Sequence, residues 1–277
     1  MKAPTLPIAV NTYSYIYSHH AFDAMRRLGA VGFENFELLF SSSHIWVSEL
    51  DRELRENPPP ICRNEGLHIT SFNLPIMDHN ITSPNPDTRD FTRRRFIELI
   101  GLAGSWSVPY VILVPGKISP LFPASNSYLM EWFMEEIRVL LDCAREYGTK
   151  ILIENVPVTF VPRASDLLTI LGEVNDPSLG IVYDVANGYY LGQDPAQELR
   201  LLGGKVDLIH LSDTGRTHWR HDPIGTGKID FASIFAAVTD IKFEGLSVME
   251  IVSPRPEHDL QESWAKLVQY GWQGKSR

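Results

Sequence analysis

Cysteine is scarce in this sequence, and no run of apolar residues is long enough to cross a membrane. Cys62 and Cys143 are the only two cysteines among 277 residues, and they lie far apart in the chain. We therefore expect two buried free thiols rather than a disulfide or a reactive site. A membrane-spanning helix needs about 18 to 20 consecutive apolar residues, and the longest apolar runs here are far shorter.

Two further features are missing: a secretory signal at the start and an excess of positive charge. The opening segment MKAPTLPIAV has one basic residue, two prolines and no long apolar stretch, so we expect a cytoplasmic protein. Lysine and arginine number 25 against 34 aspartates and glutamates, which gives a net charge of -9. Such a surface repels phosphate backbones, so the charge argues against nucleic acid as a partner and favours a small molecule.

Short apolar, β-branched stretches alternate with amphipathic ones along the whole chain. This alternation is typical of a parallel sheet whose strands are joined by helices. Eight such units, with no linker or change of composition between them, predict one α/β domain over residues 1–277, a (β/α)8 TIM barrel. The predicted strands are 8–15, 33–39, 67–74, 110–115, 150–155, 180–185, 206–212 and 246–251.

Two predicted helices have features of their own. Apolar residues at three- and four-residue spacing predict a helix over 128–147 that stops at Gly148, a residue typical of helix C-caps. Another helix is expected over 87–103, and it contains the triplet Arg93, Arg94 and Arg95. At helical spacing these side chains fan over most of a turn, which favours a solvated face over a phosphate-binding patch.

Four polar residues stand at equivalent depth in four consecutive apolar strands. Glu154 ends the fifth strand in ILIENVP, and Asp184 ends the sixth in GIVYDVANGYY. His210 in VDLIHLSDT and Glu250 in LSVMEIVSP repeat the pattern on strands seven and eight. A buried ionised carboxylate is costly unless a partner or a metal compensates it. The four residues therefore predict a metal centre at the barrel mouth, and a metal-free network of buried hydrogen bonds is the alternative.

The donor set indicates which metal to expect. Three carboxylates and one imidazole form a mainly hard-oxygen shell, which favours one divalent ion, Mn²⁺ first, with Mg²⁺, Co²⁺ or Zn²⁺ as alternatives. The set has no cysteine and so lacks the sulfur and nitrogen pattern of structural zinc. Open positions on such an ion would let a substrate carbonyl and its neighbouring hydroxyl chelate it. Asn155, directly after Glu154, is expected to support the ligands from behind.

Six segments carry a likeness to a known family, namely GFENFEL, IEN, YDVANGYY, HLSD, RHDPIGTGKID and the final MEI. Through them the whole chain resembles the sugar isomerase and epimerase superfamily of xylose-isomerase-like TIM barrels, which also contains endonuclease IV. The resemblance implies that one divalent ion is bound by Glu154, Asp184, His210 and Glu250. It also implies that the two glutamates form an acid/base pair and that Arg216 meets substrate oxygens.

The sequence departs from particular members of this superfamily. Phe160 stands where ketohexose 3-epimerases usually have a further glutamate, and Asn187 stands where they usually have a histidine, which argues against that substrate class. RHDPIGTG is similar to a stretch of endonuclease IV in which the histidine matching His221 helps hold additional zinc. That enzyme needs further histidines after strands three and four, where this chain has SFNLP and LVPGK, so a nuclease is disfavoured.

Five other residues are candidates for substrate binding. Arg216 and His221 lie on the long loop 213–227 after strand seven, which we expect to cover the substrate, because barrel enzymes build their sites from the loops after the strands. Glu37 and Asn73 end strands two and three and should face the same rim, and Asn187 stands just past strand six. The alternative for each is a structural hydrogen bond or, on the loop, simple solvation.

The predicted site contains what isomerisation of a keto-sugar requires: a polarised carbonyl, a base for the neighbouring proton and a group that returns it. Strands five and eight lie three places apart in the ring, so Glu154 and Glu250 should face a substrate from nearly opposite sides. We therefore expect a metal-dependent isomerase or epimerase that acts on a sugar or keto-sugar through an enediolate.

Two other functions use the same residues. A dehydratase or lyase of a keto-polyol, similar to inosose or dehydroshikimate dehydratases, would let the enolate expel a β-hydroxyl group. A noncatalytic sugar-binding barrel would keep the metal alone, and the intact glutamates argue against it. The sequence leaves open whether the chain forms a homo-oligomer.

Overall fold

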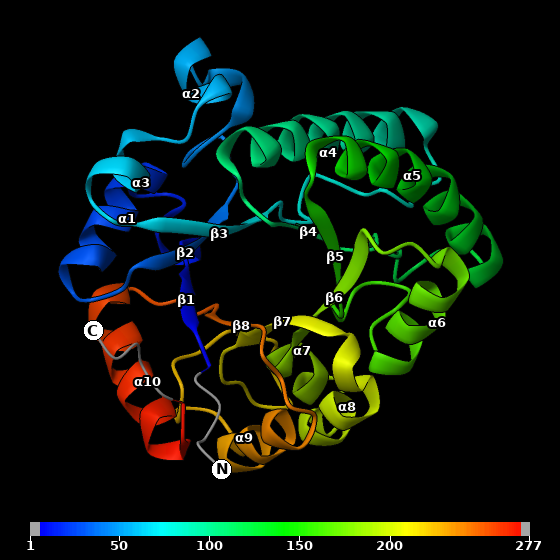
Figure 1. Ribbon diagram of the computed structural model, residues 1–277. Helices are drawn as coiled ribbons and strands as arrows, with labels where there is room; N and C mark the ends of the chain where they lie inside the picture. The colour runs from blue at the N-terminus through cyan, green and yellow to red at the C-terminus, as the bar shows by residue number, and fades with distance from the viewer. Residues whose placement is uncertain (1–5, 273–277) are drawn as a thin grey trace.

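The chain forms a closed barrel of eight parallel strands, seen end-on in Figure 1. The computed structural model describes residues 6–272. Neighbouring strands pair in chain order, and the last strand pairs with the first to close the ring. The predicted (β/α)8 fold is thus confirmed. The strands are β1 (Ile8–Asn11), β2 (Asn35–Leu39), β3 (His68–Asn73), β4 (Tyr110–Leu113), β5 (Lys150–Glu154), β6 (Leu179–Asp184), β7 (Val206–Leu211) and β8 (Leu246–Met249).

Helices form the ring around the barrel in Figure 1. They are α1 (Ala21–Ala30), α2 (Arg52–Glu56), α3 (Pro60–Asn64), α4 (Pro86–Trp106), α5 (Asn126–Tyr147), α6 (Ala164–Val174), α7 (Val185–Tyr190), α8 (Pro195–Leu202), α9 (Phe231–Asp240) and α10 (Pro256–Tyr270). The short 3-10 helices are η1 (Tyr13–Tyr15), η2 (Val47–Glu49) and η3 (Gly203–Lys205). Among the described residues, no helix combines the length and apolar character that a membrane span requires.

The barrel interior is filled by one apolar layer, which sets the position of the residues above it. This layer is a cluster of six fully buried side chains, Ala9, Ile112, Leu152, Val182, Leu208 and Val248. Side chains alternate across a strand, so the residue two places further along points to the same side. That rule turns the next residues of β1, β5, β6, β7 and β8 inward, and these are Asn11, Glu154, Asp184, His210 and Glu250. A polar layer therefore caps the apolar one at the carboxyl end of the barrel.

The first strand is shorter than predicted. It ends at Asn11 rather than continuing to residue 15, and residues 13–15 form η1 instead. The side-chain oxygen of Asn11 accepts a hydrogen bond from the backbone N–H of Tyr13 at 2.7 Å, and such local bonds favour a turn over a strand. The early turn brings Tyr13 over the barrel mouth.

The two helices singled out in the sequence are present. Helix α5 begins at Asn126, is capped by the Ser125 side chain, and ends before Gly148, whose φ of 68° is left-handed. Helix α4 extends to Trp106, three residues past the predicted end, and stops where Ser107 adopts a φ of 56°.

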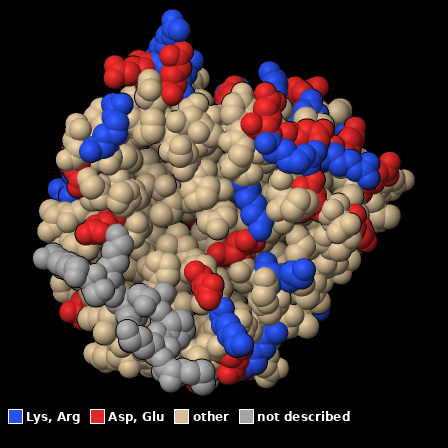
Figure 2. Space-filling model, viewed as in Figure 1, with Lys and Arg blue, Asp and Glu red and all other residues tan. Residues whose placement is uncertain are grey.

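The arginine triplet of α4 pairs with acids and is not freely solvated. Arg93 and Arg89 both reach the buried carboxylate of Glu136 on α5, at 2.9 Å and 3.5 Å. Arg94 pairs with Asp90, and Arg95 pairs with Glu98. Figure 2 shows charges of both signs interspersed over these two helices, rather than a basic patch. The prediction that this face does not bind phosphate is consistent with that arrangement. Arg93 joins α4 to α5, whereas Arg94 and Arg95 pair with acids of α4 itself.

Both cysteines are free thiols, as expected, although they are half-buried rather than fully buried. Burial raises the pKa of the Cys62 thiol to about 11, so the thiol stays protonated at neutral pH and is a poor nucleophile.

Candidate active site

The four strand-end residues predicted as metal ligands come together in the polar layer of the barrel. Each of Glu154, Asp184, His210 and Glu250 is buried, and each offers one ligand atom within 4.8 Å of the others. Nδ1 of His210 lies 3.2 Å from Glu154 Oε1, 3.3 Å from Glu250 Oε2 and 4.0 Å from Asp184 Oδ2. The side chains thus converge on one point, as expected from their register on neighbouring strands.

One oxygen of this cluster indicates what the point is built to hold. Asp184 Oδ2 is fully buried, and no group among the described residues donates a hydrogen bond to it. A buried carboxylate oxygen without a donor is costly, whereas a cation beside it removes the cost. The residues therefore fit a divalent ion, which Glu154, Asp184, His210 and Glu250 would hold.

The rest of Asp184 is held firmly. Its Oδ1 accepts the backbone N–H of Asn187 at 2.6 Å and so caps the start of α7. The Asn155 side chain accepts the backbone N–H of Asp184 at 2.7 Å and donates to its backbone oxygen at 3.0 Å. Asn155 therefore supports the candidate ligand Asp184 from behind and leaves Oδ2 pointing into the cluster.

The electrostatics of the cluster favour positive charge. Burial raises the pKa of Glu154 to about 7, and burial together with Glu250 raises the pKa of Asp184. Burial would lower the pKa of His221, but Asp184 and Glu250 raise it to about 9. Burial likewise opposes protonation of His210, yet the surrounding carboxylates raise its pKa well above the ordinary value. Protons on the histidines or a divalent ion would supply the charge that these carboxylates require.

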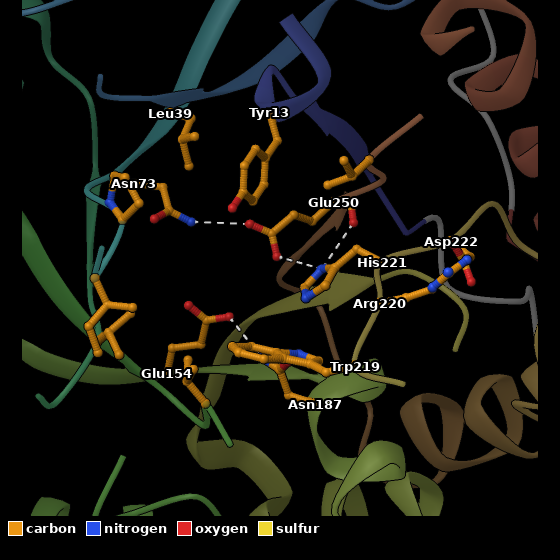
Figure 3. A pocket seen from close by; sticks show the side chains of 15 residues that line it. Tyr13, Leu39, Asn73, Glu154, Asn187, Trp219, Arg220, His221, Asp222 and Glu250 are labelled. Atoms are coloured by element: carbon orange, nitrogen blue, oxygen red, sulfur yellow. Dashed lines mark hydrogen bonds and ion pairs between the residues drawn. The ribbon is translucent and has the colours of Figure 1, made fainter. Parts of the chain in front are cut away.

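A cavity of about 490 Å³ opens directly above the cluster, which is large enough for a small sugar. Figure 3 shows Glu154 and Glu250 pointing into this cavity toward one another from different sides. Its walls combine apolar and polar residues, namely Tyr13, Leu39, Asn73, Pro75, Ile76, Val114, Val156, Asn187, Trp219, Arg220, His221, Asp222 and Val252.

Three of the predicted substrate-binding residues line this cavity. Asn73 donates to Glu250 Oε1 at 3.4 Å, and Asn187 donates to Glu154 Oε1 at 3.4 Å. His221 places Nδ1 3.2 Å from Glu250 Oε2. Both proposed acid/base glutamates thus have a polar neighbour that also faces the cavity.

The other two predicted residues lie elsewhere. Glu37 is fully buried beneath the cavity and does not contribute to its lining. The Arg216 guanidinium stacks 4.4 Å from the ring centre of Tyr189 and donates to the backbone oxygen of Gln193 at 3.5 Å, outside the cavity wall. Arg220 lines the edge of the cavity, but in Figure 3 its side chain extends away from the two glutamates.

The two aromatic residues of the wall were not singled out in the sequence. The Trp219 indole N–H donates to Asn187 Oδ1 at 2.6 Å, so the loop 213–227 does reach over the cavity. Tyr13 lines the opposite wall, and burial, with Glu250 adding to it, raises the pKa of its phenol to about 12. Tyr13 is therefore a hydrogen-bond donor at neutral pH. An aromatic residue on a loop after a barrel strand was the available signal for both.

The fold and the site together define the class of protein: a TIM barrel with three acids and a histidine at its mouth that could hold a metal ion. The chain belongs to the xylose isomerase-like TIM barrel family, whose model matches residues 22–270. This result confirms the resemblance seen in the sequence.

Individual relatives are more distant. An uncharacterized protein of Methanocaldococcus jannaschii is 26% identical over 235 residues, which cover 82% of this chain and 78% of that protein. A putative L-ribulose-5-phosphate 3-epimerase of Haemophilus influenzae is 21% identical over 243 residues and 84% of each chain.

Solved structures show the same barrel. A D-tagatose 3-epimerase-like protein superposes with a TM-score of 0.82 at 21% identity, over 96% of this chain and 97% of the other. The IolI protein, solved with a zinc atom, superposes with a TM-score of 0.78 at 18% identity, over 96% and 98%. At these identities the likeness establishes the fold.

Proposed function

We propose that this protein is a divalent-metal-dependent epimerase of a small keto-sugar. The observation that carries the proposal is the pair of glutamates, Glu154 and Glu250, which enter one cavity from different strands beside a set of metal ligands. A group that removes a proton from one face of a carbon, opposite a group that can return it to the other face, is what inversion of a stereocentre requires.

The ion would supply Lewis-acid chemistry, because it would polarise the substrate carbonyl and stabilise the negative charge that develops beside it. We propose Mn²⁺, since three carboxylates and one imidazole form a hard donor set, with Mg²⁺, Co²⁺ or Zn²⁺ as alternatives. The unpartnered Oδ2 of Asp184 supports a bound cation over a metal-free hydrogen-bond network.

The protein residues would move the proton. One glutamate takes the proton from the carbon next to the carbonyl, and the carbon–hydrogen electron pair forms the enediolate. The other glutamate, protonated, delivers its proton to the opposite face, so that the stereocentre is inverted and the two glutamates exchange protonation states. His221 donates toward Glu250 at 3.2 Å, and Asn187 donates toward Glu154 at 3.4 Å, so each carboxylate is oriented toward the cavity.

The cavity walls would keep this chemistry away from bulk water. Trp219 presents a flat aromatic face beside Glu154 and Asn187 in Figure 3, and sugar rings pack well against such faces. Tyr13 would donate a hydrogen bond to a substrate hydroxyl, and the side-chain oxygen of Asn73 would accept one, because the Asn73 amide hydrogens are used by Glu37 and Glu250. Arg216 stays a proposed substrate contact, and it requires a movement of the loop 213–227 because the guanidinium lies outside the cavity wall.

The names of relatives support a sugar epimerase over the dehydratase alternative. The curated relatives that cover most of this chain include a putative and an assigned L-ribulose-5-phosphate 3-epimerase, whereas the inosose dehydratase matches over 38% of it. Phe160 and Asn187 differ from the residues usual in ketohexose 3-epimerases, so we propose a keto-sugar outside that class or one held differently.

Exchange of substrate protons with deuterium oxide tests the proposal. Protein reconstituted with Mn²⁺ should exchange the proton next to the carbonyl of one member of a panel of ketopentoses, ketohexoses and keto-polyols, and the epimer should accumulate. Proton exchange together with a product that absorbs in the ultraviolet would refute the epimerase and show that the protein is a dehydratase. Binding without exchange across the panel would refute both enzymes in favour of a sugar-binding barrel.

A further inference from the structure

Glu37 of β2 is a carboxylate at the centre of the polar layer, yet it cannot touch a substrate. Its side chain is 0% exposed, and it lies beneath the cavity rather than in its wall. A buried charge at this position requires partners. Those partners come from β1, β3 and β7, and they indicate what Glu37 does.

Three of the partners donate hydrogen bonds to Glu37. Asn11 donates through its amide to Glu37 Oε1 at 2.6 Å, and Asn73 donates to the same oxygen at 3.3 Å. The Ser71 hydroxyl donates to Oε2 at 2.7 Å. Both oxygens of the carboxylate therefore accept hydrogen bonds.

The fourth partner is the metal-ligand candidate His210. Its Nε2 lies 3.2 Å from Glu37 Oε1 and 3.3 Å from Oε2. A carboxylate that only accepts requires a proton on that nitrogen, so Nε2 carries the hydrogen and Nδ1 can offer its lone pair to a metal. Nδ1 is the nitrogen that faces Glu154, Glu250 and Asp184.

We infer that Glu37 is a positioning residue that holds His210 in the Nε2–H tautomer and orients its Nδ1 toward the metal. This inference rests on the metal site of the proposed function. Ligating histidines commonly donate their other N–H to a carboxylate, and loss of that carboxylate costs about 10- to 100-fold in metal affinity. Asn11 and Asn73 extend the same support to Glu250, because both also donate to its Oε1, at 3.3 Å and 3.4 Å.

The first test compares Glu37→Gln with Glu198→Gln. Glu198 is another buried acid, which accepts from the Tyr183 hydroxyl at 2.7 Å on the outside of the barrel and has no contact with the cluster. Titration with Mn²⁺ against a competing chelator should show affinity about 10- to 100-fold weaker for Glu37→Gln and unchanged for Glu198→Gln. Wild-type affinity in a folded Glu37→Gln variant would overturn the inference and leave the proposed metal site standing.

The second test needs no variant at Glu37. In wild-type protein with Zn²⁺ bound and ¹⁵N-labelled histidine, the His210 ring should show a proton on Nε2 and none on Nδ1. The His210 signals are assigned by their loss in His210→Gln. A proton on Nδ1, with zinc bound through Nε2, would overturn the inference even if Glu37→Gln does not fold. A wild-type protein that binds neither ion would refute the metal site and the inference together.

Discussion

Replacement of Asp184 by asparagine should stabilise the metal-free protein and greatly reduce its stabilisation by metal. Asp184 Oδ2 is buried without a donor, and burial together with Glu250 raises the pKa of this carboxyl group. Relative to the unfolded chain, the folded protein without an ion therefore disfavours the charged form of Asp184, and asparagine removes that charge. Asparagine keeps the oxygen that accepts the Asn187 N–H at 2.6 Å, so the cap of α7 survives.

The size of the effect follows from the cost of one unsatisfied buried acceptor. That cost is about 1 to 3 kcal/mol, and loss of the charge also removes the attraction between Asp184 Oδ2 and His221 Nδ1 at 3.8 Å, so in chelator the free energy of unfolding of Asp184→Asn should exceed that of wild type by less than this amount. Mn²⁺ at a concentration of a hundred times the Kd should raise the free energy of unfolding of wild type by about 2.7 kcal/mol, and that of the variant by far less. For a chain of this size each kcal/mol moves Tm by about 2 to 4 °C, which differential scanning calorimetry resolves.

Asp213→Asn is the matched control. Asp213 is also buried, but its oxygens accept the backbone N–H groups of Gly225 at 2.8 Å and of Ile229 at 3.1 Å. Loss of its charge should lower stability with and without metal, and leave the gain from Mn²⁺ intact. The reasoning fails if Asp184→Asn is less stable than wild type in chelator and still gains the wild-type amount from Mn²⁺. That result would favour the metal-free hydrogen-bond network.

Three further predictions concern catalysis, substrate binding and pH. Glu154→Gln and Glu250→Gln should each lower kcat by at least ~10²-fold, because the amide is not a base, while metal binding weakens only modestly, because the amide keeps one ligating oxygen. Full activity of either variant with metal bound would show that the replaced glutamate does not transfer the proton. Trp219→Phe loses the 2.6 Å hydrogen bond to Asn187 but keeps the aromatic wall, and it should raise KM roughly five-fold because one hydrogen bond contributes about 1 kcal/mol. Arg216→Ala should also raise KM if the loop moves. Unchanged kinetics in both variants would exclude this loop from substrate binding. Burial lowers the pKa of His44 from 6.5 to about 4, so as the pH falls the unfolded chain takes up a proton before the folded one. The free energy of unfolding should therefore decrease by about 3 kcal/mol between pH 6.5 and pH 4. Denaturant titrations should show this extra decrease in wild type relative to His44→Gln, and parallel pH profiles of the two proteins would contradict the prediction.

Much of the site was predictable because strands impose a strict alternation on their side chains. The spacing of Leu152 and Glu154, or of Leu208 and His210, turns the second residue of each pair to the side of the first. Since consecutive strands of a barrel are neighbours, acids and a histidine at the ends of β5 to β8 meet without further information. Local hydrogen bonding of Asn11 was enough to shorten β1, but the sequence did not show that this bond would prevail over a β-branched strand.

The remaining decisions depend on contacts between segments far apart in the chain. The sequence predicted Glu37 at a strand end, like a substrate-binding residue, whereas β2 continues to Leu39 and closure of the barrel brings Glu37 within 3.2 Å of His210 on β7. Arg216 and Trp219 lie three residues apart on one loop, and nothing in their spacing indicates that the tryptophan, rather than the arginine, lines the cavity. A loop has no periodicity that assigns each side chain to a face, so its orientation is set by partners such as Asn187 and Tyr189. The sequence by itself determined the barrel and its four strand-end metal-ligand candidates, while the tertiary structure decided which other residues line the cavity and which support these candidates.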